Sequence, residues 1–427
     1  MARETILLYS GVFPLASMYG RAYSSFFILQ REAFFVSIPI YFWYPVLCTL
    51  GNGFLFMNIP PVNEQFMELF GVQYGGLSFF LSAIFWTHSI VQVPAGIFID
   101  RLGAFRSLMI CIVLCTAFSL LPFAAPKSLA LAAFSRFMLG FGTGSLFLVA
   151  VKISKILTPP NYIARVQGAQ GAAFCFGTMA PYMFLPYIGE YGWAVSYLIG
   201  VGVSVVLLVG AFRLPREKLG KGESQASLAQ VWDALKVIST SKGIWIIGCC
   251  HGFAYGTLTT IGNWLPSILA DMRPGTVTKD WAIATSVMLL VGTLGRMFGG
   301  EAPRLMRRGK LISKAVLLIG ILYFGLAFST SPFPLMVSAL TVALVCGGTY
   351  ASVFTMTIDI SAAAYVATAV GFMNMVANMV NIALTLLLGN VRDVTGSFSM
   401  GLCIAGAVAL VFWLAVRKFL RNAEKSE

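Results

Sequence analysis

The sequence predicts an all-α membrane protein in which twelve transmembrane helices form two six-helix bundles. The 427-residue chain is 58% hydrophobic and only 11% charged, whereas soluble domains carry about 25% charged residues. Twelve apolar runs reach the roughly 20 residues that a helix needs to cross the hydrocarbon core of a bilayer. A polar segment at 213–243 divides these runs into two halves of nearly equal length.

The two halves, residues 36–212 and 244–416, contain six runs each, which is typical of a parallel internal repeat related by a pseudo-two-fold axis. Glycine and proline inside several runs are compatible with spanning helices, because neighbouring helices can satisfy the freed backbone groups. The runs occupy residues 36–58, 74–95, 107–125, 129–150, 168–188, 192–212, 244–270, 281–300, 311–330, 333–357, 364–388 and 396–416.

Three segments lie outside these halves. Residues 1–35 form an N-terminal arm whose apolar part is short for a span and lacks a clear cleavage site, so we expect an interfacial or loosely ordered segment. The linker at 213–243 contains an amphipathic stretch near 227–238, which predicts a short helix on the membrane surface. Residues 417–427 form a basic tail.

The formal net charge of +13 is explained by membrane orientation without a nucleic-acid partner. With the N-terminus inside, the cytoplasmic segments carry 20 Lys and Arg residues, whereas the outer loops carry 4. Cytoplasmic loops of membrane proteins are enriched in these two residues. The sequence therefore predicts that both termini are cytoplasmic.

The residue pattern gives no indication of an enzyme, a cofactor or a bound metal. Eight cysteines lie inside apolar runs without a C-x-x-C pair, so we expect buried thiols rather than disulfides. The sequence contains no clustered set of His, Cys, Asp and Glu, no nucleophile elbow and no phosphate-binding loop.

A charged motif follows the second run and reads Gly96-Ile-Phe-Ile-Asp100-Arg101-Leu-Gly103-Ala-Phe-Arg106. It resembles the signature loop of the major facilitator superfamily, G-x-x-x-D-R-x-G-x-x-R, and lies in the corresponding loop. Gly96 would let one helix approach another closely, and Asp100 would pair with a basic side chain or a helix N-terminus. Such a cluster would hold the cytoplasmic helix ends together in one state and release them in the other.

A second motif supports this resemblance. The fourth run reads Arg136-Phe-Met-Leu-Gly140-Phe-Gly142-Thr-Gly144, which is similar to the R-x-x-x-G-x-G pattern of the superfamily. Its glycines would form a groove for another helix. The loop at 299–310 in the second half has no Asp at the matching place, so the latch is expected mainly in the first half.

The resemblance covers about residues 36–416 and implies the superfamily fold, with transport by alternating access of two bundles. It also implies a monomer whose partners are a small-molecule or ion substrate and the surrounding lipid. We expect the chain in a bacterial inner membrane or in a membrane derived from it.

Ionisable residues within the runs indicate a substrate class. No Asp or Glu lies inside any run, whereas Arg136 and Arg296 do, and charged groups deep in a membrane are costly and usually functional. A chamber with arginine and no carboxylate favours an anion, which a guanidinium binds through paired hydrogen bonds. Arg136 could instead pack within the fourth-helix motif, and Arg296 could extend to the inner surface.

The eighth run, residues 281–300, carries Arg296 ahead of the paired glycines Gly299 and Gly300. This resembles nitrate and nitrite porters, in which a second arginine from helix 2 completes the anion site. Here Gln92 stands where that second arginine is expected. The departure predicts a ligand that is less charged than nitrate or shaped differently.

Polar residues in three runs are expected to line the same chamber. Asn374, Asn378 and Asn381 share one helix face, which should point to the substrate or to a neighbouring helix. His88 and His251 are lone histidines that either pack or carry protons. Further candidates in the first and seventh runs are Asn52, Asn58, Tyr255, Asn263 and Trp264.

These observations predict a secondary active transporter of a small anionic or polar solute. Two alternatives stay open at this point. One is metal- or iron-linked transport, as in magnetosome-membrane members of the superfamily, and the other is a sensor or assembly protein that does not transport.

Overall fold

The structure, a computed structural model, describes residues 43–159, 162–220, 228–273, 275–300, 306–362 and 365–422. These residues form helices joined by turns, and none of them lies in a β-strand. Each of the twelve predicted runs overlaps a helix. The predicted arm at 1–35 falls outside the described residues, as do residues 301–305 of the second-half loop.

Ten helical segments of the described chain are long and apolar enough to cross a membrane. The two other predicted runs correspond to α2 (Tyr44–Met57) and α7 (Ile163–Phe184). The described part of α2 begins only at Tyr44, and the first turns of α7 carry Arg165, Gln167 and Gln170, which lower its hydropathy. The chain is therefore a multi-pass membrane protein.

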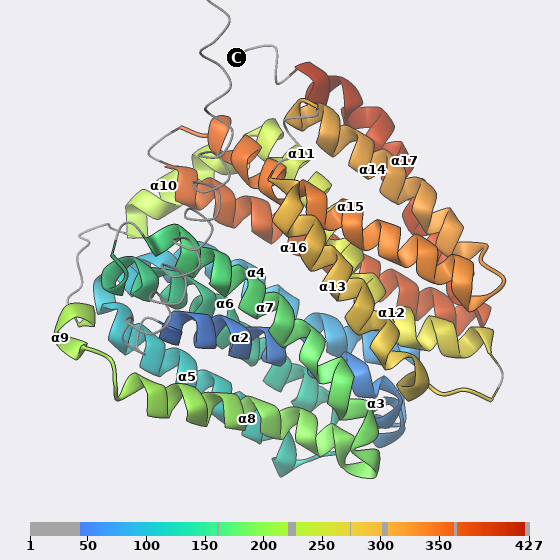
Figure 1. Ribbon diagram of the computed structural model, residues 1–427, viewed down its shortest axis with the longest axis horizontal. Helices are drawn as coiled ribbons and strands as arrows, with labels where there is room; N and C mark the ends of the chain where they lie inside the picture. The colour runs from blue at the N-terminus through green and yellow to red at the C-terminus, as the bar shows by residue number, and fades with distance from the viewer. Residues whose placement is uncertain are drawn as a thin grey trace, which may run out of the picture. The chain divides into compact units, whose positions relative to one another are not determined.

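The first bundle, drawn blue to green in Figure 1, consists of α2, α4 (Tyr74–Leu102), α5 (Ala104–Leu120), α6 (Leu129–Leu157), α7 and α8 (Gly192–Ala211). Within it α4 packs against α6, α2 packs against α7, and α5 packs against α6 and α8.

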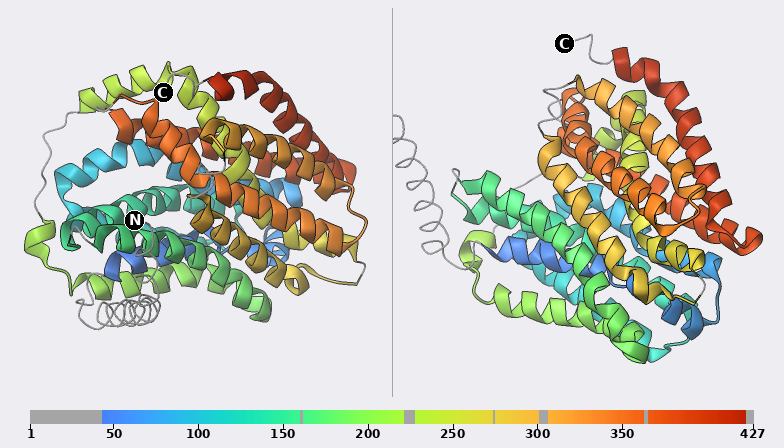
Figure 2. Two further views of the ribbon diagram at one scale, coloured as in Figure 1. Left: turned by 45° about the horizontal axis from the view of Figure 1, so that its top comes forward. Right: turned by 45° about the vertical axis from the view of Figure 1, so that its right-hand side comes forward.

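The second bundle, drawn yellow to red in Figure 2, begins with α11 (Lys242–His251), which continues through the π-helical turn η7 (Gly252–Gly256) into α12 (Thr257–Met272). It continues with α13 (Ala282–Gly299), α14 (Arg308–Ala327), α15 (Pro332–Asp359), α16 (Val366–Thr395) and α17 (Phe398–Asn422). Within it α13 packs against α15, α14 packs against α17, and α11 packs against α16.

The bundles meet along two helix pairs, α4 with α16 and α7 with α13. Each pair joins the second spanning helix of one bundle to the fifth spanning helix of the other. The pseudo-two-fold relation between the bundles exchanges these two pairs. The helices at this interface supply most of the walls of the cavity described below.

Glycines set the distance between several helices, and α6 forms the groove that its pattern predicts. A Cβ at Gly144 would lie 2.8 Å from the His88 carbonyl oxygen of α4, and a Cβ at Gly142 would lie 2.8 Å from the Cys115 Sγ of α5. Glycine also brings two helices of the second bundle close together, because a Cβ at Gly299 in α13 would meet the backbone of α15. Larger side chains at these positions would push the helices apart.

The signature loop differs from the prediction at Gly96. No described atom lies within 4 Å of a Cβ built there, so no helix approaches Gly96 closely in this conformation. Gly103 makes the closer contact: its φ of +82° suits glycine, and its Cβ would lie 2.9 Å from the Gly220 oxygen. Arg101 and Arg106 are exposed.

Three short α-helices lie outside the two sets of spanning helices in the described chain, namely α3 (Asn63–Phe70), α9 (Arg216–Leu219) and α10 (Leu228–Ser239). α10 matches the helix predicted in the linker. Its Ala234 and Ile238 are buried, and the helix packs against α16, whereas Trp232 is exposed. Its position on a membrane surface stays a prediction.

Candidate functional site

A cavity of about 560 Å³ lies between the two bundles. Its walls come from α2, α4, α6 and α7 of the first bundle and from α11, η7, α13, α15 and α16 of the second. No lining residue carries a carboxylate. The polar lining residues are Asn52, His88, Gln92, Cys175, His251, Tyr255, Thr293, Arg296, Tyr350, Asn374 and Asn378.

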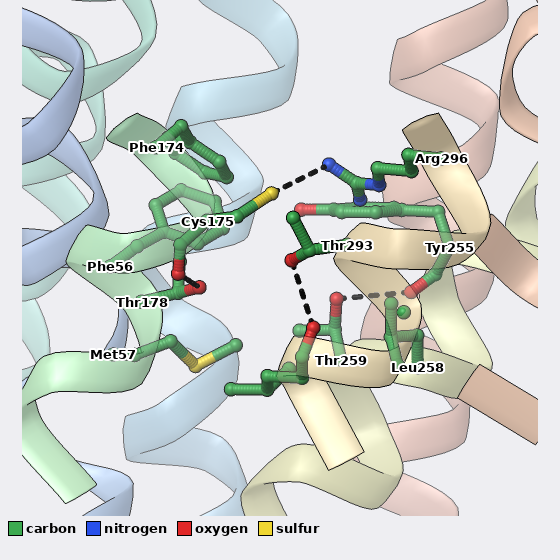
Figure 3. A pocket seen from close by; sticks show the side chains of 12 residues that line it. Phe56, Met57, Phe174, Cys175, Thr178, Tyr255, Leu258, Thr259, Thr293 and Arg296 are labelled. Atoms are coloured by element: carbon green, nitrogen blue, oxygen red, sulfur yellow. Dashed lines mark hydrogen bonds between the residues drawn. The ribbon is translucent and has the colours of Figure 1, made fainter. Parts of the chain in front are cut away.

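Arg296 projects from α13 into this cavity, with partners from two other helices. Its guanidinium lies over the Tyr350 ring of α15, 4.7 Å from the ring centroid. Its Nη1 lies 3.6 Å from the Sγ of Cys175, which belongs to α7 in the other bundle (Figure 3). A thiol and an aromatic ring are weak partners, the ring contributing about 0.5–2 kcal/mol. Neither of these two partners neutralises the charge of Arg296.

A smaller void of about 30 Å³ continues beyond Arg296, and Figure 3 shows the side chains that line it. The void shares Cys175, Tyr255 and Arg296 with the main cavity, and Met57 and Leu258 lie beyond them. A space of this size holds a water molecule or a methyl group. Arg296 therefore lies close to the closed floor of the cavity.

The π-helical turn places His251 and Tyr255 side by side. Their rings stack with centroids 5.6 Å apart, and the Tyr350 ring lies 5.8 Å from the ring of His251. The turn lies close against α16, since a Cβ at Gly256 would lie 3.0 Å from the Asn381 Cα. Such turns occur frequently at functional sites. His251 is only 4% exposed, and its Nδ1 has no hydrogen-bond partner among the described residues.

Amide side chains provide neutral polar groups in the cavity wall. Asn52 is 0% exposed, and neither of its amide atoms has a partner in the described chain. Asn378 donates to the Asn374 carbonyl oxygen at 3.0 Å, while its own Oδ1 has no described partner. The third member of the predicted face, Asn381, accepts from Thr260 Oγ1 at 3.1 Å, so it joins two helices and does not line the cavity.

Arg136 lies outside the cavity, in the core of the first bundle. It is 2% exposed, and its Nη1 donates to the Asn58 Oδ1 at 3.1 Å. Asn58 in turn donates to the Ser196 carbonyl oxygen at 2.7 Å, which links α2, α6 and α8. This placement agrees with the packing alternative for Arg136 and removes Asn58 from the lining.

Contacts between the bundles close the end of the molecule that carries α3, here named the Asn63 end. Asn63 Nδ2 donates to the Asn263 carbonyl oxygen at 3.0 Å. The backbone N–H groups of Tyr74 and Gly75, the first residues of α4, donate to the Asp393 carboxylate of α16 at 2.9 and 2.7 Å. Asn263, which was predicted to line the cavity, therefore belongs to this closed end. Trp264, also a predicted lining residue, is buried away from the cavity.

The opposite end carries the signature loop and is here named the Asp100 end. Asp100 accepts from the Lys152 Nζ of α6 at 2.8 Å, so its basic partner lies in the same bundle. In the second bundle, Arg308 at the start of α14 pairs with Asp359 at the end of α15 at 2.9 Å. The second half therefore contains an ion pair between two helix ends, with Arg308 on the earlier helix and Asp359 on the later one, where the sequence predicted a weaker latch.

The cavity lies towards the Asp100 end. Gly168 and Gly171, near the start of α7, and Met297, near the end of α13, line it and are exposed. These helix ends lie at the Asp100 end, whereas the cross-bundle hydrogen bonds made by Asn63, Tyr74 and Gly75 lie at the Asn63 end. This is the geometry of a transporter-like chamber that is closed on one side.

Three polar lining residues were not identified from the sequence, namely Cys175, Thr293 and Tyr350. Cysteine, threonine and tyrosine are common in apolar runs, so a single sequence gives no signal that separates them from packing residues. Gln92 and His88 also line the cavity. His88 Nδ1 lies 3.1 Å from the Thr143 hydroxyl of α6, so this imidazole has a partner.

Comparisons with known proteins agree with the fold. The chain is 24% identical over 395 residues to the probable sulfoacetate transporter SauU of Cupriavidus necator, covering 84% of this chain and 88% of the relative. It is 26% identical over 358 residues to the hexuronate transporter of Bacillus subtilis, covering 78% and 83%. A solved structure of a mutant nucleoside transporter NupG has a TM-score of 0.74 at 14% identity, covering 90% of this chain and 100% of the other.

The sequence model of the Major Facilitator Superfamily matches residues 46–385, which is most of the chain. The matched region contains the signature loop, the fourth-helix glycines and the helices that surround the cavity. From this match and from the arrangement of the two bundles, the chain belongs to the major facilitator superfamily of membrane transporters.

Proposed function

We propose that this chain is a secondary active transporter of a small organic anion, with Arg296 as the residue that binds the acid group. The observation that carries the proposal is the position of Arg296 at the floor of the cavity. The described lining residues include no carboxylate, and the partners of the guanidinium among the described residues are a thiol and an aromatic ring. A guanidinium binds a carboxylate or a sulfonate through two parallel hydrogen bonds. Partial exclusion of water strengthens that attraction.

The amides of the wall fit the rest of such a solute. Asn52 and Asn378 carry buried amide atoms without a described partner. Buried polar groups are normally hydrogen-bonded, and an exception calls for an explanation. Hydroxyl groups or further oxygens of the solute would supply the missing partners. We therefore expect a preference for anions with additional polar groups over simple fatty acids.

The relatives support the same class of solute. Sulfoacetate and hexuronates, which appear in the names of two relatives, are organic acids that are ionised at neutral pH. Their identities to this chain are low, so they support the chemical class and leave the particular solute open. The cationic floor of the cavity disfavours a bare metal cation, and the presence of a chamber favours transport over a sensor or assembly role.

The membrane orientation follows the distribution of Lys and Arg. We place the Asp100 end and both termini in the cytoplasm of a bacterium, in the inner membrane or a membrane derived from it. The structure then corresponds to an inward-facing state. Transport would alternate it with a state in which the contacts of the Asn63 end are broken and the Asp100 end is closed.

The test is uptake into proteoliposomes that contain the purified chain. We expect accumulation of labelled D-glucuronate or sulfoacetate and no accumulation of D-glucose. Arg296→Gln should lower uptake by at least about 30-fold, because losing a charged partner in a partly dry site costs about 2–5 kcal/mol. The matched control is Arg417→Gln, which removes an exposed arginine that stacks on Trp413 outside the cavity.

The control variant should transport like the wild type. Equal uptake by the Arg296→Gln variant and the wild type would contradict the proposed role of Arg296. Preference for glucose over both acids would contradict the proposed solute class.

A further inference from the structure

We infer that His251 is a proton-binding site coupled to the anion site, so that the chain binds a proton together with its anion. This inference rests on the proposed function and adds a coupling ion to it. Its basis is geometric: a buried imidazole, whose Nδ1 has no hydrogen-bond partner among the described residues, shares the Tyr350 ring with Arg296 of the cavity wall.

The surroundings of His251 are unusual for a packing histidine. It lines the cavity, yet its Nδ1 has no hydrogen-bond partner among the described residues. Three aromatic rings enclose it, with centroids 5.6 Å away for Tyr255, 5.8 Å for Tyr350 and 5.6 Å for Phe354. Aromatic faces accommodate a cation as well as a neutral ring. The pocket can therefore hold either protonation state.

Arg296 and His251 share the Tyr350 ring. The guanidinium lies 4.7 Å from the centroid of that ring, and the imidazole ring lies 5.8 Å from it. Two cations this close in a site of low dielectric constant repel each other. An anion bound to Arg296 would cancel that repulsion. A proton on His251 and an anion on Arg296 therefore favour each other, and this linkage is reciprocal.

No other described group around His251 can replace it in this role at neutral pH. The neighbouring elements present two tyrosines, on η7 and α15, a cysteine on α7 and amides on α16. Tyrosine and cysteine side chains bind and release protons mainly above pH 8. Across the cavity, α4 presents His88, whose Nδ1 already faces Thr143 at 3.1 Å and whose ring packs on Phe56 at 4.7 Å.

His88 provides a comparison for proton uptake alone, because it lines the same cavity but its Nδ1 has a partner. The experiment uses purified full-length wild type and the variants His251→Gln and His88→Gln in weakly buffered detergent solution with a pH-indicator dye. The probes are sodium D-glucuronate and sodium sulfoacetate. Proton uptake on addition of each probe is measured between pH 5 and 8, the range in which histidine changes charge. Binding is followed separately by thermal shift.

We expect the wild type to take up as much as one proton per bound anion. Its affinity should be at least about 5-fold higher at pH 5.5 than at pH 8, the lower bound of common coupling factors. His88→Gln should still take up protons on anion binding, even if its affinity changes, because its imidazole lies across the cavity from Arg296 and has Thr143 as a partner. His251→Gln should still show a thermal shift, but with no proton uptake and with an affinity that does not change with pH.

Two results would overturn the inference while leaving the proposed function intact: anion binding by the wild type without proton uptake, or unchanged proton uptake by His251→Gln. The first needs no variant, so the test holds even if His251→Gln does not fold. If neither probe caused a thermal shift, the proposed function would be overturned, and this inference with it.

Discussion

The two arginines inside the spanning helices differ in their partners, and the partners decide their roles. Arg136 donates to Asn58 in the core of the first bundle, where its charge is held by fixed hydrogen bonds. Arg296 faces a thiol and a ring at the floor of the cavity. The first arrangement joins helices, whereas the second leaves a cation that can bind a solute.

The same contrast between two asparagines, Asn52 within α2 and Asn58 directly after it, gives a prediction. Asn52 lines the cavity and has no described partner, whereas Asn58 makes two hydrogen bonds. Asn52→Ala should weaken anion binding about 5- to 10-fold, the value of one hydrogen bond. The melting temperature should change little, because the lost amide had no internal partner. Binding titration and thermal unfolding measure the two effects.

Asn58→Ala serves as the control with the opposite outcome. It leaves the buried Arg136 cation without its side-chain acceptor, so we expect a loss of stability of about 2–3 kcal/mol and a clearly lower melting temperature. A strong destabilisation by Asn52→Ala with unchanged binding would contradict the assignment of Asn52 to the solute site.

At the scale of helices, the close contact between α13 and α15 positions Arg296. A Cβ at Gly299 would lie 2.6 Å from the Gly348 carbonyl oxygen, and the neighbouring Gly300 has no described atom within 4 Å of its Cβ position. Gly299 lies three residues after Arg296 on the same helix. The spacing of these helices therefore determines where the guanidinium lies over Tyr350.

We predict that Gly299→Ala lowers the stability by about 1–3 kcal/mol, the usual cost of overpacking against backbone that cannot move aside. Anion affinity should also fall, because α13 must shift away from α15. Gly300→Ala, one residue further, should leave both properties unchanged. Thermal unfolding and binding titrations of the two variants test the contact, and equal effects at both positions would contradict it.

The helices themselves were predictable from the sequence, because length and hydropathy decide which segments cross a bilayer. The π-helical turn at Gly252–Gly256 was not, since a single widened turn leaves no periodic signal in an apolar run. Arg296, Asn52 and His251 stood out because polar groups are rare inside such runs. Tyr350 did not stand out, because tyrosine is common inside such runs.

The sequence also could not separate Arg136 from Arg296. Both are arginines within apolar runs, and the difference lies in which neighbours each helix face meets. That depends on long-range packing, such as the contact of α2 with α6, which local pattern does not encode. Binding of a solute by Arg136 stays a prediction.

At the scale of the whole molecule, the closed Asn63 end includes a helix cap supplied by the other bundle. Asp393 of α16 accepts from the first two N–H groups of α4, and Gln73, which precedes α4, makes no side-chain cap. A carboxylate at a helix N-terminus stabilises it by about 0.3–1 kcal/mol, and the charged hydrogen bonds add to this. The contact exists only while the bundles are closed at this end.

We therefore predict that Asp393→Asn shifts the population towards a state open at the Asn63 end, by about 5- to 30-fold for a loss of 1–2 kcal/mol. Spin labels at the exposed positions Glu68→Cys and Ser397→Cys should report this as a new, longer distance. The native cysteines are buried or half-buried and should label slowly. Asp280→Asn, which removes a cap within the second bundle only, is the control and should leave the distances unchanged.

The most direct test of the account is a structure of the chain with a bound anion, either D-glucuronate or sulfoacetate. We predict that the acid group lies within about 3 Å of the Arg296 guanidinium, the usual distance of a charged hydrogen bond. Displacement of the Cys175 thiol from Arg296 should accompany it. An anion bound elsewhere, with Arg296 still on Cys175 and Tyr350, would contradict the central claim that Arg296 is the anion-binding residue.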